Sequence, residues 1–395
     1  MLGFIFLFII FVILLILSNY IKDLRIKKII SIISLVILCL ISGTRYNIGG
    51  SDYFWYKNLY QKVPTNNIFE QLLSFSNSTG IEKGFVFYMS VVKILGFNFY
   101  GFTLINSIIF YSLFYKALKH YNYNINFILV VFLYKMFFYN TFISIRQPIA
   151  IIIFWLALPF LKEKKYIKYF LMCFVAFLFH RSSIVLFFIP FITHFKISKN
   201  SFLLLLIIGL LSFVVVKLDL LNIKSFIGNV LIIIFRNDTA GISRAENYLN
   251  SSMGMSIFYL LEYYSIALLV YRHYDKIMNI DENSEFFIKL FICLLPLYTV
   301  FHNFSIVTRF KDFFFLSYPI MLIYISKCLK KNKIILFTVT VLVCFYGYIR
   351  YINNFDNGEL KNYSSYIFER VSIFNKNDWK GNYYEKNQNF DFNRK

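Results

Sequence analysis

The stretch LGFIFLFIIFVILLILS at residues 2–18 contains no charged side chain and decides the class of fold. Coiled as an α-helix at about 1.5 Å per residue, it is about 25 Å long, close to the roughly 30 Å hydrocarbon thickness of a bilayer. Similar stretches recur along the 395-residue chain, in which 58% of residues are apolar and only 15% are charged. Soluble globular proteins do not have this balance. We therefore expect an all-α, polytopic integral membrane protein and not a water-soluble enzyme.

The apolar stretches predict about twelve membrane-spanning helices separated by short polar breaks. They lie at about residues 2–18, 28–43, 99–118, 126–141, 147–161, 166–180, 183–195, 202–218, 256–272, 286–302, 313–329 and 334–350. Two further apolar pieces, 84–96 and 227–235, are interpreted as partial helices on the outer side. Gly96 and Gly101 separate the first piece from the next span. If residues 84–96 also crossed the membrane, the basic breaks between spans would lie on opposite sides of it.

Basic residues gather in some of these breaks and set the predicted orientation. Lysine and arginine number 41 against 20 aspartate and glutamate, which gives a net charge of +21. Because loops rich in lysine and arginine stay in the cytoplasm, we place the breaks after the first, fifth and eleventh spans there. They contain Lys22, Arg25, Lys27 and Lys28, then Lys162, Lys164, Lys165 and Lys168, then Lys327, Lys330, Lys331 and Lys333. The charge is thus explained by orientation and anionic lipid, and we expect no nucleic acid partner.

This topology predicts one transmembrane domain over residues 1–350, with outer loops at 43–83 and 219–255. A polar C-terminal tail at 351–395 would also lie outside the cytoplasm. The opening stretch has neither a basic segment ahead of it nor a small-residue cleavage site, so we interpret it as a retained span. The five cysteines have no paired spacing, which supports neither a disulfide framework nor a metal site.

Four arginines lie at the predicted outward ends of spans, against the cytoplasmic bias of positive charge: Arg45, Arg146, Arg181 and Arg309. An arginine without an anionic partner is costly at membrane depth, although one at the interface lowers the cost by extending its head group into water. Guanidinium groups suit bidentate contacts with phosphate oxygens. A phosphate or diphosphate head group at the outer interface would explain all four arginines together, whereas interfacial extension would explain any single one.

Arg146 has the most informative local sequence, SIRQPIA at residues 144–150. Pro148 suits the first turn of a helix, where its missing N–H is not needed. Arg146 and Gln147 then precede a positive helix terminus, where a further positive charge is unfavourable unless an anion shares the site. We interpret both residues as phosphate or sugar ligands. The alternative is a purely structural ion pair of Arg146 with Glu82 or Asp52.

The first outer loop opens with TRYNIGGSDYFWY at residues 44–56. Asp52 follows Arg45 closely there, and Tyr53 and Tyr56 come directly after it. A carboxylate, a guanidinium and aromatic faces together form a platform suited to a sugar, and the alternative is an interfacial aromatic belt. Glu82 precedes the first partial helix, where it is either an N-terminal cap or a proton acceptor.

His180 ends the sixth predicted span in FHRSS, residues 179–183. A helix C-terminus favours its charged form, while Arg181 and partial burial favour the neutral ring, so we expect its pKa near the working pH. A general base for a sugar hydroxyl requires such a pKa. A purely structural histidine is the alternative. Ser182 and Ser183 are expected to cap the next helix.

Several of these segments together resemble a known family. TRYNIGGSDY, EKGF at 82–85, RQPIA at 146–150, FHRSS and the late Arg309 occur in the order and spacing seen in the EpsG family of bacterial capsule and exopolysaccharide proteins, related to Wzy-type polymerases. The resemblance covers residues 30–330. It implies a GT-C-like bundle in the bacterial cytoplasmic membrane with an active site facing outside the cytoplasm.

The resemblance also implies a reaction and a set of residues. A growing oligosaccharide would be released from its polyprenyl diphosphate carrier and joined to a hydroxyl of the next lipid-linked repeat unit, without metal or cofactor. The residues at matching positions are Arg45, Asp52, Glu82, Arg146, Gln147, His180 and Arg309. The arginines would hold the diphosphate, and His180, or otherwise Asp52 or Glu82, would accept the proton. Expected partners are the lipid-linked oligosaccharide, membrane lipid, and a flippase and chain-length regulator of the same pathway.

Four alternatives stay open. A flippase or transporter of lipid-linked oligosaccharide would suit the many spans, although the two-fold repeat common in such folds is not visible. A polymer ligase would need nearly the same site. A metal-dependent transferase using polyprenyl monophosphate sugars would place a close acidic pair in the first outer loop, and residues 43–83 have none. A membrane acyltransferase would need a buried histidine site, for which only His180 is suitable.

Overall fold

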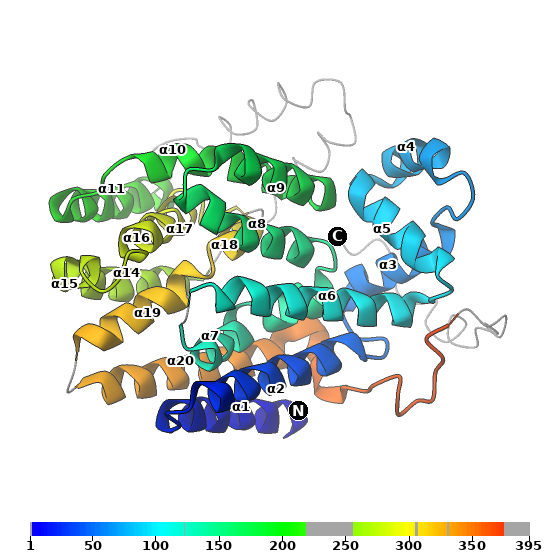
Figure 1. Ribbon diagram of the computed structural model, residues 1–395, viewed down its shortest axis with the longest axis horizontal. Coiled ribbons are helices and arrows are strands. Elements are labelled where there is room, and N and C mark those ends of the chain that lie inside the picture. Colours follow the sequence, from blue (N-terminus) through cyan, green and yellow to red (C-terminus); the bar gives the residue numbers. More distant parts are fainter. Residues whose placement is uncertain (1, 122, 219–255, 305–306, 330–331, 375–395) are drawn as a thin grey trace.

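The computed structural model describes residues 2–121, 123–218, 256–304, 307–329 and 332–374, and these residues are mostly helical. Figure 1 shows the long helices lying side by side across the picture. Three shorter helices, α3 (Gly50–Lys62), α4 (Ile68–Thr79) and α5 (Lys83–Ile94), gather at one end of them. Within the described residues the only β-pairing is two isolated bridges, Arg45 with Ser365 and Phe97 with Phe374. The predicted all-α class is confirmed.

Each of the twelve predicted spans coincides with helical structure. In chain order these are α1 (Leu2–Tyr20), α2 (Leu24–Gly43), α6 (Phe99–Lys119), α7 (Ile125–Phe132) continued by the π-helical turns η1 (Leu133–Phe137) and η2 (Tyr139–Ile143), α8 (Gln147–Lys162), α9 (Tyr166–Phe179), the 3₁₀ helix η3 (Arg181–Phe188) with α10 (Ile189–His194), α11 (Lys199–Lys217), α14 (Ile257–Arg272), α16 (Ser284–Ile292) with α17 (Leu294–Tyr298), α18 (Val307–Phe313) with α19 (Ser317–Cys328), and α20 (Lys333–Asn354). The short α15 (Tyr274–Met278) and the 3₁₀ helix η5 (Phe355–Asn362) lie in connections.

Helix length divides these spans into two groups. Within the described ranges, four helices are long and apolar enough to cross a membrane: α1, α6, α11 and α20. The other stretches are shorter or interrupted, apart from the 20-residue α2, whose first turns contain Arg25, Lys27 and Lys28, so the number twelve is not confirmed. One interruption has a clear cause at Pro296, whose ring clashes with the carbonyl four residues back and whose N–H is missing. That carbonyl belongs to Ile292, the last residue of α16.

Burial distinguishes inner from outer helices. All of α7 except its first residue is buried, and α8 buries most of its length around Trp155, whose indole N–H donates to the carbonyl of Phe313 at 2.8 Å. The outer helices expose large apolar side chains instead, such as Phe6 of α1 and Leu211 of α11. Apolar surface of this extent is stable against lipid and not against water. The chain is a membrane protein.

The first outer loop is more ordered than its sequence suggested. It folds into α3 and α4, whereas the sequence predicted only a loop from 43 to 83. The predicted partial helix 84–96 is observed as α5, whose length of 12 residues is too short for a crossing. The second partial helix, 227–235, and the outer loop 219–255 lie outside the described residues.

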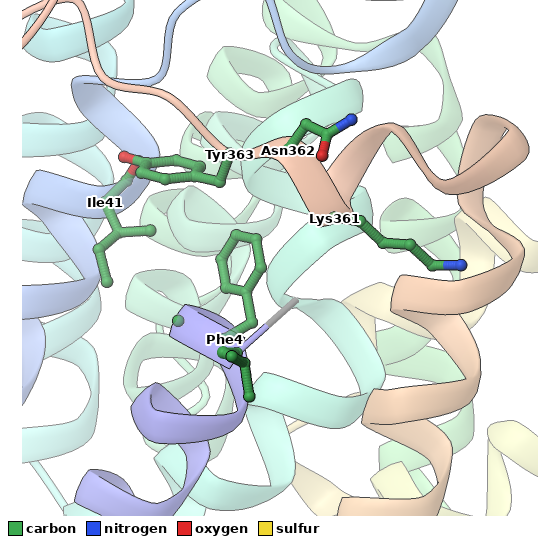
Figure 2. Close-up of a pocket in the computed structure, with 7 residues that line it drawn as sticks. Phe4, Ile41, Lys361, Asn362 and Tyr363 are labelled. Carbon is green, nitrogen blue, oxygen red and sulfur yellow. The ribbon is translucent and has the colours of Figure 1, made fainter.

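The chain after α20 returns to the same end as α3, α4 and α5 (Figure 1). It passes through η5 and continues to Phe374 without further helix, with a turn at residues 366–370. Lys361, Asn362 and Tyr363 from this segment line a hollow of about 700 Å³ together with the start of α1 and Ile41 of α2 (Figure 2). The predicted polar tail is therefore packed against the bundle over its described part.

Candidate functional site

Two neighbouring helices bring predicted site residues to one end of the bundle. α8 and α9 pack against each other and are joined by a short turn. Arg146 stands immediately before α8, and His180 immediately after α9. Because consecutive helices with a short turn run antiparallel, both residues lie at one end, while Lys162 and Lys165 lie at the other.

The Arg146 guanidinium is held by a side chain of α3 and by the residue that precedes α5. Its Nε donates to the Tyr56 hydroxyl at 2.6 Å, and its Nη1 donates to Glu82 Oε2. Burial alone would lower the pKa of Arg146, but Tyr56 and Glu82 outweigh burial and raise it, so the group stays charged. Within the described residues Nη2 makes no hydrogen bond to the protein. One nitrogen is left for a ligand.

Glu82 connects Arg146 to the chain after α9. It occupies the N-terminal position of α5 but does not cap that helix. Its Oε1 instead accepts the backbone N–H of Arg181 at 2.9 Å. Gly84 permits this arrangement, because a Cβ there would lie 2.7 Å from the side chain of Leu178 in α9. The ion pair considered as the structural alternative for Arg146 is thus present, with Glu82 as its partner.

His180 is buried just beyond the last residue of α9, with 6% of its surface exposed. The backbone N–H of Ser182 donates to Nδ1 at 3.2 Å, and the Ser182 hydroxyl lies 2.6 Å from the same nitrogen. Nδ1 is therefore an acceptor, and the neutral ring carries its proton on Nε2. Burial and the charges of Arg146 and Arg309 place the pKa of His180 well below its ordinary value.

The expectation that Ser182 and Ser183 cap the next helix is wrong. His180 itself takes the N-terminal position of η3, and its imidazole accepts the Ser182 amide. An imidazole reaches this amide because His180 has extended backbone, with φ −156° and ψ 122°. The two serines lie within the 3₁₀ helix instead.

Gln147 links α8 to α18 and brings Arg309 to the site. Its side chain is fully buried, and its Nε2 donates to the carbonyl of Arg309 at 2.7 Å. The Gln147 Oε1 has no hydrogen-bond partner within the described residues. The Arg309 guanidinium lies within hydrogen-bonding reach of the Tyr139 hydroxyl and close enough to His180 for its charge to act there. The charges of Arg146 and Arg309 thus both act on one histidine.

Asp52 presents an exposed carboxylate beside this group. It lies in the first turn of α3, one turn before Tyr56. Its charge reaches the hydroxyls of Tyr56 and Tyr139. In the part of the chain that the structure describes, no ion pair or hydrogen bond involves the Asp52 side chain. Of the three predicted proton acceptors, it is the one that the protein does not already engage.

Arg45 and Tyr53 lie in an enclosed environment. The Arg45 guanidinium is 2% exposed and donates to the carbonyls of Ser42 and Phe142, the second at 3.3 Å. It also lies 5.1 Å from the centroid of the buried Tyr53 ring. Burial lowers the pKa of Arg45. These contacts connect Arg45 to the end of α2 and to η2, and they leave little surface for a substrate.

A second polar group, the interior cluster, lies deeper in the bundle and was missed by the sequence analysis. Two ion pairs form it: Lys135 with Glu262 at 2.7 Å, and Lys311 with Asp312 at 2.8 Å. Asn140 donates to Asp312 at 2.8 Å. The sequence contained a signal, because Lys135 and Glu262 lie inside predicted spans and an ionisable residue there is by default a functional candidate. The π-helical turns around Lys135 and Asn140 are also frequent at functional sites.

Helix α18 carries residues of both groups, Asp312 of the interior cluster and Arg309 of the site near His180. Arg309 and Asp312 are three residues apart on this helix and therefore lie on the same face. Tyr139 lies near both side chains. Together the fold and these charged residues define a helical membrane protein that has two arginines and an exposed carboxylate at one end of the bundle.

Comparison with known proteins then places the chain. A model of the EpsG family matches residues 28–365, nearly the whole chain, and the protein belongs to the EpsG family. The match includes every predicted site residue, as well as the interior cluster. No curated protein and no solved structure matches the chain.

Proposed function

We propose that this protein is a polysaccharide polymerase that joins polyprenyl-diphosphate-linked oligosaccharide units at the outer face of the cytoplasmic membrane. Membership of the EpsG family suggests a polysaccharide-related polymerase. The observation that carries the proposal is the convergence of Arg146 and Arg309 on His180, beside the exposed carboxylate of Asp52.

The distribution of charge supports an outward-facing site. Arg146 and His180 lie at one end of α8 and α9, and the basic residues of the α8–α9 turn lie at the other. Because such basic turns stay in the cytoplasm, the end that carries the site faces out. A lipid diphosphate at head-group depth carries the phosphate oxygens that guanidinium groups bind well.

Each residue then has a defined role in the transfer. The acceptor hydroxyl oxygen forms a bond to the anomeric carbon of the donor sugar, while the bond from that carbon to the diphosphate oxygen breaks. The lipid diphosphate leaves with the bonding electrons, and its developing charge is stabilised by Arg146 Nη2 and by Arg309. Asp52 accepts the hydroxyl proton, because Glu82 is already engaged with Arg146 and Arg181. The Nε2–H of His180 donates to a phosphate oxygen.

This assignment gives the base role to Asp52 in place of His180, for two reasons. Both hydrogen bonds of Nδ1 are internal to the protein, so Nδ1 is not directed at a substrate hydroxyl. The lowered pKa of His180 also keeps the ring neutral with its proton on Nε2, so the second ring nitrogen is a hydrogen-bond donor and not a proton acceptor. Burial of the neutral ring instead preserves a hydrogen-bond donor without adding a third positive charge.

The decisive experiment incubates the purified protein in lipid nanodiscs with a polyprenyl-diphosphate repeat unit and resolves the products by gel electrophoresis. A ladder of oligomers is expected, together with release of polyprenyl diphosphate. Asp52→Asn should suppress the ladder while the protein still binds the donor. A wild-type protein that instead moves the intact lipid-linked unit across liposomes, with no ladder, would identify a flippase. A ladder that disappears with chelator would assign the reaction to the metal-dependent alternative.

A further inference from the structure

The chain from Glu359 to Phe374, which we call the strap, is bound to the outer loop by backbone and side-chain hydrogen bonds. Tyr46 N–H donates to the Ser364 carbonyl at 2.9 Å, and Tyr366 N–H donates to the Thr44 carbonyl at the same distance. Contacts of this kind are the pairing of an antiparallel ladder. The first part of the strap is therefore held in register against the chain that leads into α3.

The far end of the strap is bound at a second point, the start of α6. Asn98 N–H donates to the Ile373 carbonyl at 3.0 Å, and Asn98 Nδ2 donates to the Ser372 carbonyl at 2.6 Å. Gly101 permits this approach, because a Cβ there would lie 2.5 Å from the Ile373 carbonyl oxygen. The strap thus connects the beginnings of α3 and α6 on the same end of the bundle.

Glu359 connects the strap to the start of α3 through hydrogen bonds to its carboxylate. Its Oε2 accepts the Gly50 N–H at 2.9 Å, and its carboxylate accepts the Gly49 N–H at 3.3 and 3.4 Å. Gly49 has φ +146° and Gly50 has φ +68°, conformations that glycine adopts without strain. They turn two successive N–H groups toward the carboxylate, at a helix end where negative charge is favourable.

The start of α3 depends on this remote residue because its own sequence supplies no cap. Gly49 occupies the N-terminal cap position and has no side chain to accept a hydrogen bond. On its other side there is no free space, since a Cβ on Gly49 would lie 2.3 Å from the Phe142 carbonyl oxygen. The first turn of α3 is therefore held between Glu359 and the chain before α8.

We propose that Glu359 is a positioning residue for the reaction. Its carboxylate holds the N-terminus of α3, and α3 in turn presents Tyr56, whose hydroxyl accepts Arg146 Nε at 2.6 Å. Asp52 is carried by the first turn of the same helix. The proposal rests on the proposed function, because the step it affects is the stabilisation of the leaving diphosphate by Arg146 and proton transfer to Asp52.

The test compares Glu359→Gln and Glu359→Asp with the wild-type chain in nanodiscs. Glu369→Gln is the matched control, since Glu369 is on the same strap but is exposed and, within the described residues, accepts only the Ser364 hydroxyl, at 2.6 Å. Hydrogen exchange of peptides covering residues 44–56 reports the anchoring of α3, and kcat and KM for a polyprenyl-diphosphate repeat unit report positioning. Exchange does not depend on turnover.

In Glu359→Gln we expect exchange at the start of α3 to be about tenfold faster and kcat to fall about tenfold, as for the loss of one hydrogen bond to a charged group. The KM should change by less than about twofold, because Arg146 acts mainly on charge that develops in the transition state. Glu359→Asp should recover part of the rate, and Glu369→Gln should match the wild type.

Unchanged exchange and unchanged kcat in Glu359→Gln would overturn the proposal. So would a lower yield of folded protein with wild-type kcat per folded molecule, because that result indicates a structural role alone. If the wild type makes no ladder, the proposed function fails, while faster exchange in Glu359→Gln still supports the anchoring of α3.

Discussion

Replacing Arg146 by lysine separates a ligand-binding guanidinium from a structural ion pair. Arginine engages Tyr56 through Nε and Glu82 through Nη1, and Nη2 remains for a phosphate oxygen. Lysine keeps the charge but has a single nitrogen, so it cannot serve all three partners at once. A hydrogen bond to a charged group contributes about 1.5–3 kcal/mol. At about 1.4 kcal/mol per tenfold in rate, losing the phosphate contact lowers kcat by about 10- to 150-fold.

Glu82→Gln is the companion variant, because it removes the charge of the partner and preserves its shape. Breaking a buried ion pair costs about 3–5 kcal/mol. The side chains of Glu82 and Arg146 are 7% and 16% exposed, so partial hydration of Arg146 reduces the cost to about 2 kcal/mol. We expect this loss in thermal stability, with a smaller loss of kcat than in Arg146→Lys.

The assay measures ladder formation per folded molecule in nanodiscs, alongside the unfolding temperature of each variant. A purely structural pair would give the opposite pattern, in which both variants lower the unfolding temperature equally and keep wild-type kcat. Wild-type chain length and rate in Arg146→Ala as well would refute the diphosphate role of Arg146. Additive effects on kcat in the double variant Arg146→Lys, Glu82→Gln would further show that Glu82 does not act through Arg146.

Three more predictions test the structure around the site. Burial lowers the pKa of Lys57 to about 8, below its unfolded value near 10.5. Between these pH values the unfolded chain binds more protons than the folded chain, so the unfolding temperature should rise with pH from about 8 to 10. In Lys57→Gln this rise should be absent. Gly49→Ala should abolish folded protein in size-exclusion chromatography, because its Cβ would lie 2.3 Å from a carbonyl oxygen. Gly96→Ala, which has positive φ but open space around it, should cost only about 1 kcal/mol of unfolding free energy. Equal behaviour of the two variants would contradict this account. Lys135→Met should lower the unfolding temperature more than the double variant Lys135→Met, Glu262→Leu, because the single substitution leaves the buried charge of Glu262 without its partner. A double variant less stable than the single one would refute this account.

The sequence predicts the positions of the membrane helices well, because an apolar stretch such as 2–18 requires burial or lipid whatever it packs against. It does not predict where helices are interrupted. Pro296 marks one break, but the π-helical turns after Phe132 depend on packing around the interior cluster. Helix α3 was not predicted because its sequence, GSDYFWYKNLYQK, has no apolar stripe and its start is capped from a residue more than 300 positions away.

The candidate site shows the same division. The position of Arg146 at a helix start could be predicted because Pro148 follows it closely, and the structure places Arg146 directly before α8. Its role as an anion ligand stays a prediction. Arg45 has the same charge and the same predicted location, yet its guanidinium is enclosed by carbonyls that only the fold brings near. The orientation of His180 likewise follows from a local hydrogen bond to Ser182, which residue spacing does not reveal.

The strap has a consequence for biogenesis. Its partners, residues 44–50 and Asn98, are synthesised long before residues 359–374. Every helix from α1 to α20 must therefore be synthesised before the N-terminus of α3 receives its carboxylate. A nascent chain that still lacks residues 359–374 already contains Arg146 and Asp52, but Glu359 does not yet hold the start of α3. Under the proposed function, such a chain would not yet join lipid-linked sugars.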